Sequence, residues 1–240
     1  MFRLEREDDL ARLTLDRSEV RNAIPAAGWA ALADKLEAVA GGGARLLVVT
    51  GADDAFCAGA DLKDLAAMRG DEGAIARFRI DMRAALDRLR TLAIPTVAVI
   101  GGPCYGAGVA LALACDIRLA RLGAKFAITP ARIGIAFPQE DVHRLLALVG
   151  PGQASRLLFT AETIGGDEAK KIGLVEYSCH PESEMIQTIL ANDPESLAGL
   201  KRGIALAGAG VRSDPEQDRR FDALIAGDEM ALRLEALRRK

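Results

Sequence analysis

Apolar residues in the first half of the chain form short runs separated by stretches with helical spacing. Residues 4–15 alternate loosely between apolar and polar positions, which predicts two short strands around a turn at Asp8-Asp9. Continuous apolar runs predict buried strands at 45–50, 96–100 and 116–120, and the segments between them predict helices at 26–39, 72–92 and 106–114. Buried strands that alternate with helices indicate an α/β fold with a parallel sheet covered on both faces.

After Pro130 most segments have helical spacing. Helices are predicted at 142–149, 152–159, 168–172, 182–190 and 194–206, and one or two more at 221–239 follow a helix start at 213–216. Only the segment 174–177 has the composition of a strand. We therefore expect an α/β core over residues 1–190 and a helical C-terminal region over residues 191–240.

The composition is that of an ordinary globular protein. Half of the 240 residues are hydrophobic and 27% are charged, which excludes disordered, collagenous and disulfide-scaffold classes. The 31 basic and 34 acidic residues show no clustered basic excess, so nucleic-acid binding is not expected. The longest uncharged stretch, residues 91–115, contains two prolines and four glycines, so we expect a strand, a turn and a buried helix there rather than a membrane span.

The cysteines and histidines bear on compartment and metal binding. The four cysteines form no Cys-x-x-Cys pair; they are Cys57, Cys104, Cys115 and Cys179. The charged N-terminus lacks the apolar segment of a signal peptide. Both observations predict a cytoplasmic protein with reduced thiols. With only His143 and His180 in the chain, no metal site is expected.

Two glycine-containing junctions between a predicted strand and a predicted helix could carry chemistry. In the first, residues 55–63, Gly59 permits a sharp turn and Asp61 is a suitable helix N-cap. The second, residues 101–108, does not fit the Gly-x-Gly-x-x-Gly dinucleotide fingerprint. Each junction alone also fits a structural role, as a capped loop or as close helix–sheet packing. Together they could direct two free backbone N–H groups at one oxygen atom.

The sequence resembles the enoyl-CoA hydratase/isomerase (crotonase) family. The resemblance is carried by Asp16-Arg-x-x-x-Arg-Asn22-Ala, Phe56-Cys-Ala-Gly-Ala-Asp61-Leu-Lys63, Ile94-Pro-Thr-Val-Ala, Gly106-Ala-Gly-Val-Ala-Leu-Ala-Leu-Ala-Cys-Asp116 and Gly173-Leu-Val. It implies a crotonase-like spiral of ββα turns, and a C-terminal helical region that packs in homotrimers, often paired into hexamers. It also implies an acyl-CoA thioester as substrate, with CoA as part of that substrate and no separate cofactor.

The resemblance also implies site residues. In this family two backbone N–H groups hold the enolate oxygen, and the matching positions here are Ala60 and Ala107. The matching positions along the adenosine and pantetheine of CoA are Ala58, Ala60, Asp61, Leu62 and Lys63, with Arg21 and Lys63 as phosphate contacts.

Two positions depart from the pattern of the family's hydratases, which use two glutamates to position and activate water. Ala110 and Pro130 stand at those positions here, and Pro130 also breaks the single-glutamate isomerase pattern. Because each acid–base group typically contributes about 10²–10⁴-fold, we do not expect efficient hydration. The segment 129–134 resembles the decarboxylating branch instead, but Phe137 replaces the tyrosine of that branch and Ala110 its helix glutamate.

Glu140 and Asp141 are the acids that could replace the missing glutamates. They begin a predicted helix at residue 139, where the family has a glycine-rich turn beside the acyl pocket. One of them could act as acid or base, with its pKa raised by the apolar pocket, or both could stabilise the helix N-terminus by about 0.3–1 kcal/mol each. Three functions stay open: an enolate-forming lyase, isomerase or hydrolase, a non-catalytic acyl-CoA binder, and a structural subunit. We favour the first, because two intact N–H motifs have little purpose in a scaffold.

Overall fold

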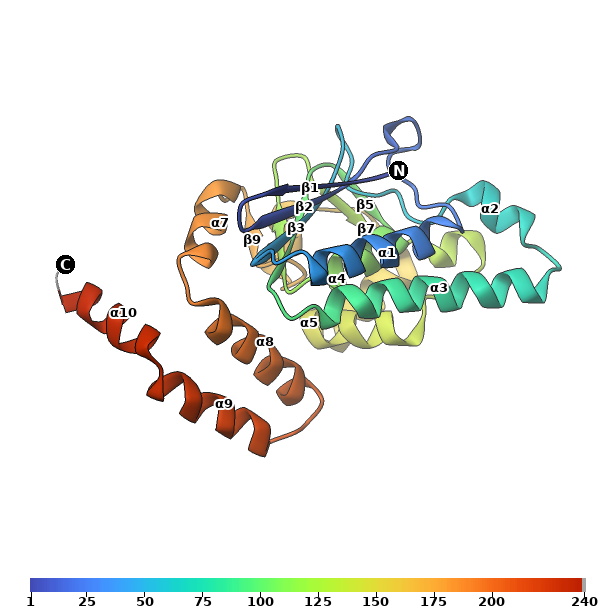
Figure 1. Ribbon diagram of the computed structural model, residues 1–240. Helices are drawn as coiled ribbons and strands as arrows, with labels where there is room; N and C mark the ends of the chain where they lie inside the picture. Colours follow the sequence, from blue (N-terminus) through green and yellow to red (C-terminus); the bar gives the residue numbers. More distant parts are fainter. Residues whose placement is uncertain (239–240) are drawn as a thin grey trace.

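A six-stranded sheet lies at the centre of the computed structural model, which describes residues 1–238 (Figure 1). The strand order is β1-β2-β3-β4-β6-β9. β1 pairs with β2 in antiparallel fashion, and every other neighbouring pair is parallel. The strands are β1 (Phe2–Glu7), β2 (Leu10–Leu15), β3 (Leu46–Gly51), β4 (Thr96–Ile100), β6 (Ile117–Ala120) and β9 (Tyr177–Ser178).

Helices cover both faces of this sheet. Leu47 and Val49 of β3 belong to the main core beneath α1 and α3, whereas Leu46 and Val48 face a smaller core that Met185 of α7 completes. The predicted sheet covered on both faces is therefore confirmed. The helices of the core are α1 (Gly28–Gly41), α2 (Leu62–Ala67), α3 (Glu72–Thr91), α4 (Ala107–Leu113), α5 (Gln139–Thr160), α6 (Gly166–Lys171) and α7 (Glu182–Leu190).

A second, three-stranded sheet was not predicted. It has the order β5-β7-β8, and its strands are β5 (Pro103–Tyr105), β7 (Lys125–Ala127) and β8 (Ile164–Gly165). Strands of two or three residues are too short for an alternating pattern to show in the sequence. The strand predicted at 174–177 was largely wrong, because Leu174 and Val175 are buried outside any strand and β9 begins at Tyr177.

The C-terminal helices extend away from the sheet (Figure 1). They are α8 (Pro194–Gly208), α9 (Pro215–Ala226) and α10 (Asp228–Arg238), and the prediction at 221–239 reaches one residue beyond the part that the structure describes. Large apolar side chains on these helices are exposed, among them Leu200, Ile204, Phe221 and Leu237. No helix within residues 1–238 is long and apolar enough to cross a membrane.

Candidate active site

The segment after β3 and the segment before α4 lie in contact. The Tyr105 N–H donates to the Cys57 carbonyl oxygen at 2.9 Å, which joins the two segments. Gly59, with φ at 107°, lies at one close approach of the two segments. A Cβ atom on Gly59 would be 2.9 Å from the Tyr105 carbonyl oxygen and 3.4 Å from the Ala107 nitrogen. Glycine at this position therefore allows the two segments to approach each other.

The N–H groups of Ala60 and Ala107 are both unpaired here. Ile24 forms hydrogen bonds on either side of Ala60, to the Gly59 carbonyl oxygen at 2.8 Å and from the Asp61 N–H at 2.9 Å, which leaves the Ala60 N–H unused. Ala107 is the first residue of α4, so its N–H has no partner within the helix. Across residues 1–238, neither N–H donates a hydrogen bond. Both residues line one cavity.

The walls of this cavity are largely apolar. Side chains from α2, α3 and the segment before α5 line it, including Leu62, Leu65, Phe78, Met82, Ile133 and Phe137. Ala110 and Pro130, which stand at the positions of the two glutamates in the family's hydratases, line it as well. Among the described residues, Asp141 is the one charged residue in the lining. Any proton transfer by a carboxylate inside the cavity would therefore have to involve Asp141.

The structure distinguishes Asp141 from its neighbour Glu140. The Asp141 side chain is 0% exposed, whereas that of Glu140 is 59% exposed and outside the cavity lining. Asp141, Leu145 and Val149 are four residues apart along α5 and all three are buried, so they share the inward face of the helix. This spacing is the sequence signal that could have separated the two acids.

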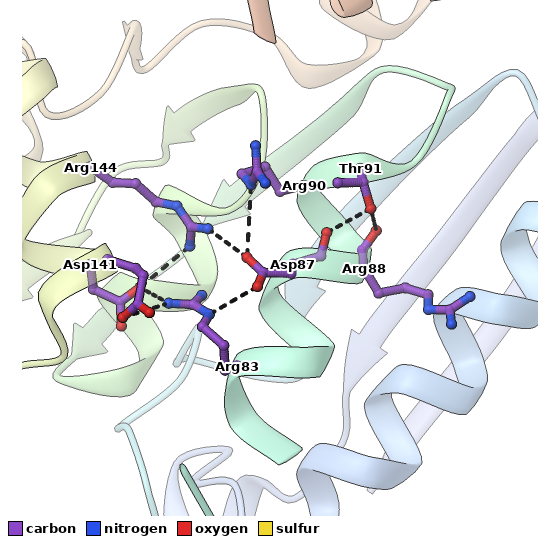
Figure 2. A network of polar contacts seen from close by, with 8 residues as sticks. Arg83, Asp87, Arg88, Arg90, Thr91, Asp141 and Arg144 are labelled. Carbon is purple, nitrogen blue, oxygen red and sulfur yellow. Dashed lines mark hydrogen bonds and ion pairs between the residues drawn. The ribbon is translucent and has the colours of Figure 1, made fainter. Parts of the chain in front are cut away.

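Two arginines bind one oxygen of Asp141 and leave the other free (Figure 2). Oδ1 accepts from Nη1 of Arg83 at 3.2 Å and from Nη1 of Arg144 at 3.4 Å. Oδ2 is buried and has no hydrogen-bond partner in the described part of the chain. Burial raises the pKa of the Asp141 carboxyl above its usual value, against the opposing effect of the two guanidinium groups. One oxygen of the Asp141 carboxylate thus has no partner among the described residues.

The carboxylate of Asp61 forms hydrogen bonds within the protein. As predicted, it is the N-cap of α2, and its carboxylate accepts from the Lys63 N–H at 2.9 Å and from Nη1 of Arg17 at 2.8 Å. The hydrogen bond from Arg17, followed by that from the Lys63 N–H, lowers the pKa of Asp61. The carboxylate therefore fixes the loop that carries Ala60.

The remaining predicted binding residues lie around the same loop. The Ala58 N–H donates to the Arg21 carbonyl oxygen at 2.9 Å, which brings Arg21 beside the loop. The side chains of Arg21 and Lys63 are exposed and form no ion pair with any residue of the described chain. Leu62 is 63% exposed and Ala58 half-buried, and both line the cavity. Ala58 and Leu62 thus line the cavity, whereas Arg21 and Lys63 are outside its lining.

Comparison with known proteins identifies the family. A sequence profile of the enoyl-CoA hydratase/isomerase family matches residues 5–202. Crotonyl-CoA hydratase of Syntrophomonas wolfei is 37% identical over 185 residues, 75% of this chain and 69% of that protein. Rat mitochondrial methylglutaconyl-CoA hydratase is 37% identical over 129 residues, 54% of this chain and only 40% of that protein.

The fold agrees with this match. The crystal structure of an enoyl-CoA hydratase/isomerase family protein from Hyphomonas neptunium superposes with a TM-score of 0.92 at 31% identity, covering 98% of this chain and 94% of the other. Both the expected α/β fold with its helical C-terminal region and the resemblance of the motifs are confirmed. The chain belongs to the enoyl-CoA hydratase/isomerase family.

Proposed function

We propose that this chain is an acyl-CoA enzyme, a lyase or isomerase that acts through an enolate. The Ala60 and Ala107 N–H groups would bind the thioester oxygen, and Asp141 would transfer the proton. The observation that carries the proposal is that Asp141, whose Oδ2 has no hydrogen-bond partner in the described chain, lines the same cavity as Ala60 and Ala107. The names of the relatives support an acyl-CoA thioester as the substrate. We further propose that CoA takes part only as a portion of that substrate, with no separate cofactor.

The proposed chemistry divides the work between backbone and side chain. Oδ2 of ionised Asp141 takes a proton from the carbon next to the thioester, and the electron pair moves onto the thioester oxygen. Two N–H groups stabilise the charge that develops there, and one such donor is typically worth about 10²–10³-fold in turnover. A raised pKa suits Asp141 to this role, because a general base works best when its pKa lies near the working pH.

We do not propose that this chain hydrates enoyl-CoA efficiently. A hydratase of the family uses two glutamates on one water molecule, and the side chains at those positions are the uncharged Ala110 and Pro130. A decarboxylase-like reaction is the second candidate, supported by the sequence of residues 129–134. Loss of CO₂ generates the enolate directly, so that reaction would need the two N–H groups but no base.

Exchange of the substrate's α-proton for solvent deuterium tests enolate formation whatever the final product. The protein is incubated with butyryl-CoA and other acyl-CoA thioesters in D₂O, and mass spectrometry follows both deuterium uptake and new products. We expect exchange by the wild type, a loss of at least about 10²-fold in Asp141→Asn, and a change below about twofold in Glu140→Gln.

The variants also separate the alternatives. Unchanged exchange by Asp141→Asn would refute the assignment of the base. Binding of acyl-CoA in a calorimeter, with no exchange and no product from any thioester, would favour the non-catalytic binder. Absence of acyl-CoA binding would favour the structural subunit. Loss of CO₂ from a carboxyacyl-CoA that persists in Asp141→Asn would favour the decarboxylase.

We also propose that α8, α9 and α10 mediate assembly into a homotrimer or hexamer. The exposed apolar side chains of these helices, including Leu200, Phe221 and Leu237, support this assignment. Light scattering coupled to size exclusion would measure the mass in solution. A monomer at micromolar concentration would contradict the proposal.

A further inference from the structure

Four charged side chains from α3 and α5 form an alternating network around the cavity acid (Figure 2). Arg83 and Asp87 come from α3, and Asp141 and Arg144 come from α5. Each guanidinium contacts both carboxylates. Arg144 donates through Nη1 to Asp141 at 3.4 Å and through Nη2 to Asp87 at 2.9 Å.

Arg83 bridges the same two acids. Its Nη1 lies 3.2 Å from Oδ1 of Asp141, and its Nε lies 3.4 Å from Oδ2 of Asp87. The guanidinium group is planar and rigid, so a second carboxylate on it fixes its orientation toward the first. Asp87 therefore contacts both arginines that meet Asp141, although it is absent from the cavity lining and its side chain is 44% exposed.

We propose that Asp87 is a positioning residue for Asp141, holding Arg83 and Arg144 on Oδ1 so that Oδ2 stays unbound. This inference rests on the proposed role of Asp141. The two arginines repel each other, and Asp87 is the anion that lies between them on the side away from Asp141 (Figure 2). With Asp87 in place, the four charges sum to zero, two positive and two negative.

Three other charged side chains lie near this network, and each has its own contact. Glu140 of α5 lies 3.7 Å from Nη1 of Arg83, and Arg90 of α3 lies 3.8 Å from Asp87. Arg132, before α5, donates to the Ala161 carbonyl oxygen instead. Helix α4, which also packs against α5, consists of uncharged residues from Ala107 to Leu113. Burial, Arg83 and Arg144 are therefore the main influences on the pKa of Asp141, and Glu140 raises that pKa further. Asp87 would act through the two arginines.

Neutralising an acid of the network and neutralising one of its arginines should shift the pKa of Asp141 in opposite directions. Asp87→Asn leaves a net charge of +1 on the network and should lower the pKa by about 0.5–1 unit. Arg83→Gln leaves a net charge of −1 and should raise it by about 1 unit. The pKa is measured by NMR titration of protein labelled with ¹³C at the aspartate carboxyl carbons, and the Asp141 signal is identified by its absence in Asp141→Asn. This readout does not depend on turnover.

Kinetics provide the second readout, with Asp81→Asn as the matched control. Asp81 lies on the same helix and forms no ion pair with any described residue, so its substitution makes the same charge change without touching the network. We expect Asp87→Asn to lower kcat for α-proton exchange by about 3–10-fold with KM unchanged, because the base is weaker and less firmly oriented.

The outcomes separate this inference from the proposed function. If Asp141→Asn loses exchange but Asp87→Asn matches Asp81→Asn in titration and in kcat, the positioning role is refuted and the base stands. If Asp141→Asn retains exchange, the base assignment fails, while opposite pKa shifts in Asp87→Asn and Arg83→Gln would still establish the network. Shifts of the same sign in those two variants would overturn the inference.

Discussion

The backbone nitrogen of Ala107 lies directly against Gly59, 3.4 Å from where a Cβ atom on that glycine would stand. The Tyr105 carbonyl oxygen is closer still, at 2.9 Å from that point. The contact brings together the two segments that carry the cavity-lining residues Ala60 and Ala107. The distance between the two segments thus depends on Gly59, which has no side chain.

Replacement of Gly59 by alanine should disturb that separation. The new methyl group cannot fit beside the Tyr105 carbonyl, and a φ of 107° is strained for any residue with a Cβ atom. We expect a loss of roughly 1–3 kcal/mol in the free energy of unfolding, and slower turnover. Gly70→Ala is the control, because Gly70 has φ at 86° with nothing within 4 Å of the new methyl group. Equal turnover in the two variants would contradict a special role for Gly59.

Ala107→Pro removes the N–H group with little change elsewhere. Ala107 is the first residue of α4, where proline is tolerated, and Gly106 before it has φ 50° and ψ −115°, outside the α region that a following proline disfavours. We expect turnover to fall by about 10²–10³-fold and the affinity for a ground-state thioester to change much less. Turnover, calorimetric affinity and melting temperature are compared with those of the wild type. A folded variant with normal turnover would show that this N–H does not bind the reacting oxygen.

Hydration of crotonyl-CoA should be slow. With Ala110 and Pro130 in place of two glutamates, the rate should lie at least about 10³-fold below that of a family member that has both. The loss of the crotonyl absorbance on hydration is measured for the two proteins at equal concentration. A difference of less than tenfold would disprove this interpretation of the two positions.

Asp61→Ala should destabilise the protein in a pH-dependent way. The substitution removes a helix cap and the bond from Arg17, at a cost of about 1–2 kcal/mol at pH 7. Because the folded state lowers the pKa of Asp61 below 3.8, this stabilisation is fully present above pH 3.8 and is lost as the pH falls through the folded-state value. Urea unfolding of both proteins at pH 7, 5, 4 and 3 measures the difference.

Asp34→Ala provides the comparison for that series. Asp34 is exposed on α1 and forms no ion pair within residues 1–238, so its removal should change stability little at any of these pH values. A difference between wild type and Asp61→Ala that is the same at pH 7 and pH 3 would show that the ionised carboxylate is not what stabilises the loop.

The elements with strong local signals could be predicted from the sequence. The continuous apolar run of β4 was placed at its observed bounds, and α3 was placed to within one residue. Asp61 was recognised as a cap because its side chain bonds within its own turn. These features depend on neighbours along the chain, which a sequence pattern records.

The features that were missed depend on residues far apart in sequence. Arg83 meets Asp141 from 58 positions away, and no local pattern specifies which arginine on α3 faces α5. The spacing of Arg83 and Asp87 at i and i+4 shows that they share a helix face, but the partner of that face comes from the tertiary structure. The second sheet was missed for the same reason, since its short strands are defined by pairing rather than by composition.

The two halves of the proposed chemistry differ in how readily substitution can alter them. The unpaired donors are backbone groups of Ala60 and Ala107, which almost any side chain at those positions would preserve, whereas the free acceptor is one carboxylate on a different helix. Single substitutions along the inward face of α5 can therefore add, remove or relocate an acid while the donors stay where they are. In the proposed chemistry, backbone groups stabilise the charge and are hard to change by substitution, whereas a side chain on α5 moves the proton and is easily replaced. Redesign of the reaction can therefore begin at α5 alone.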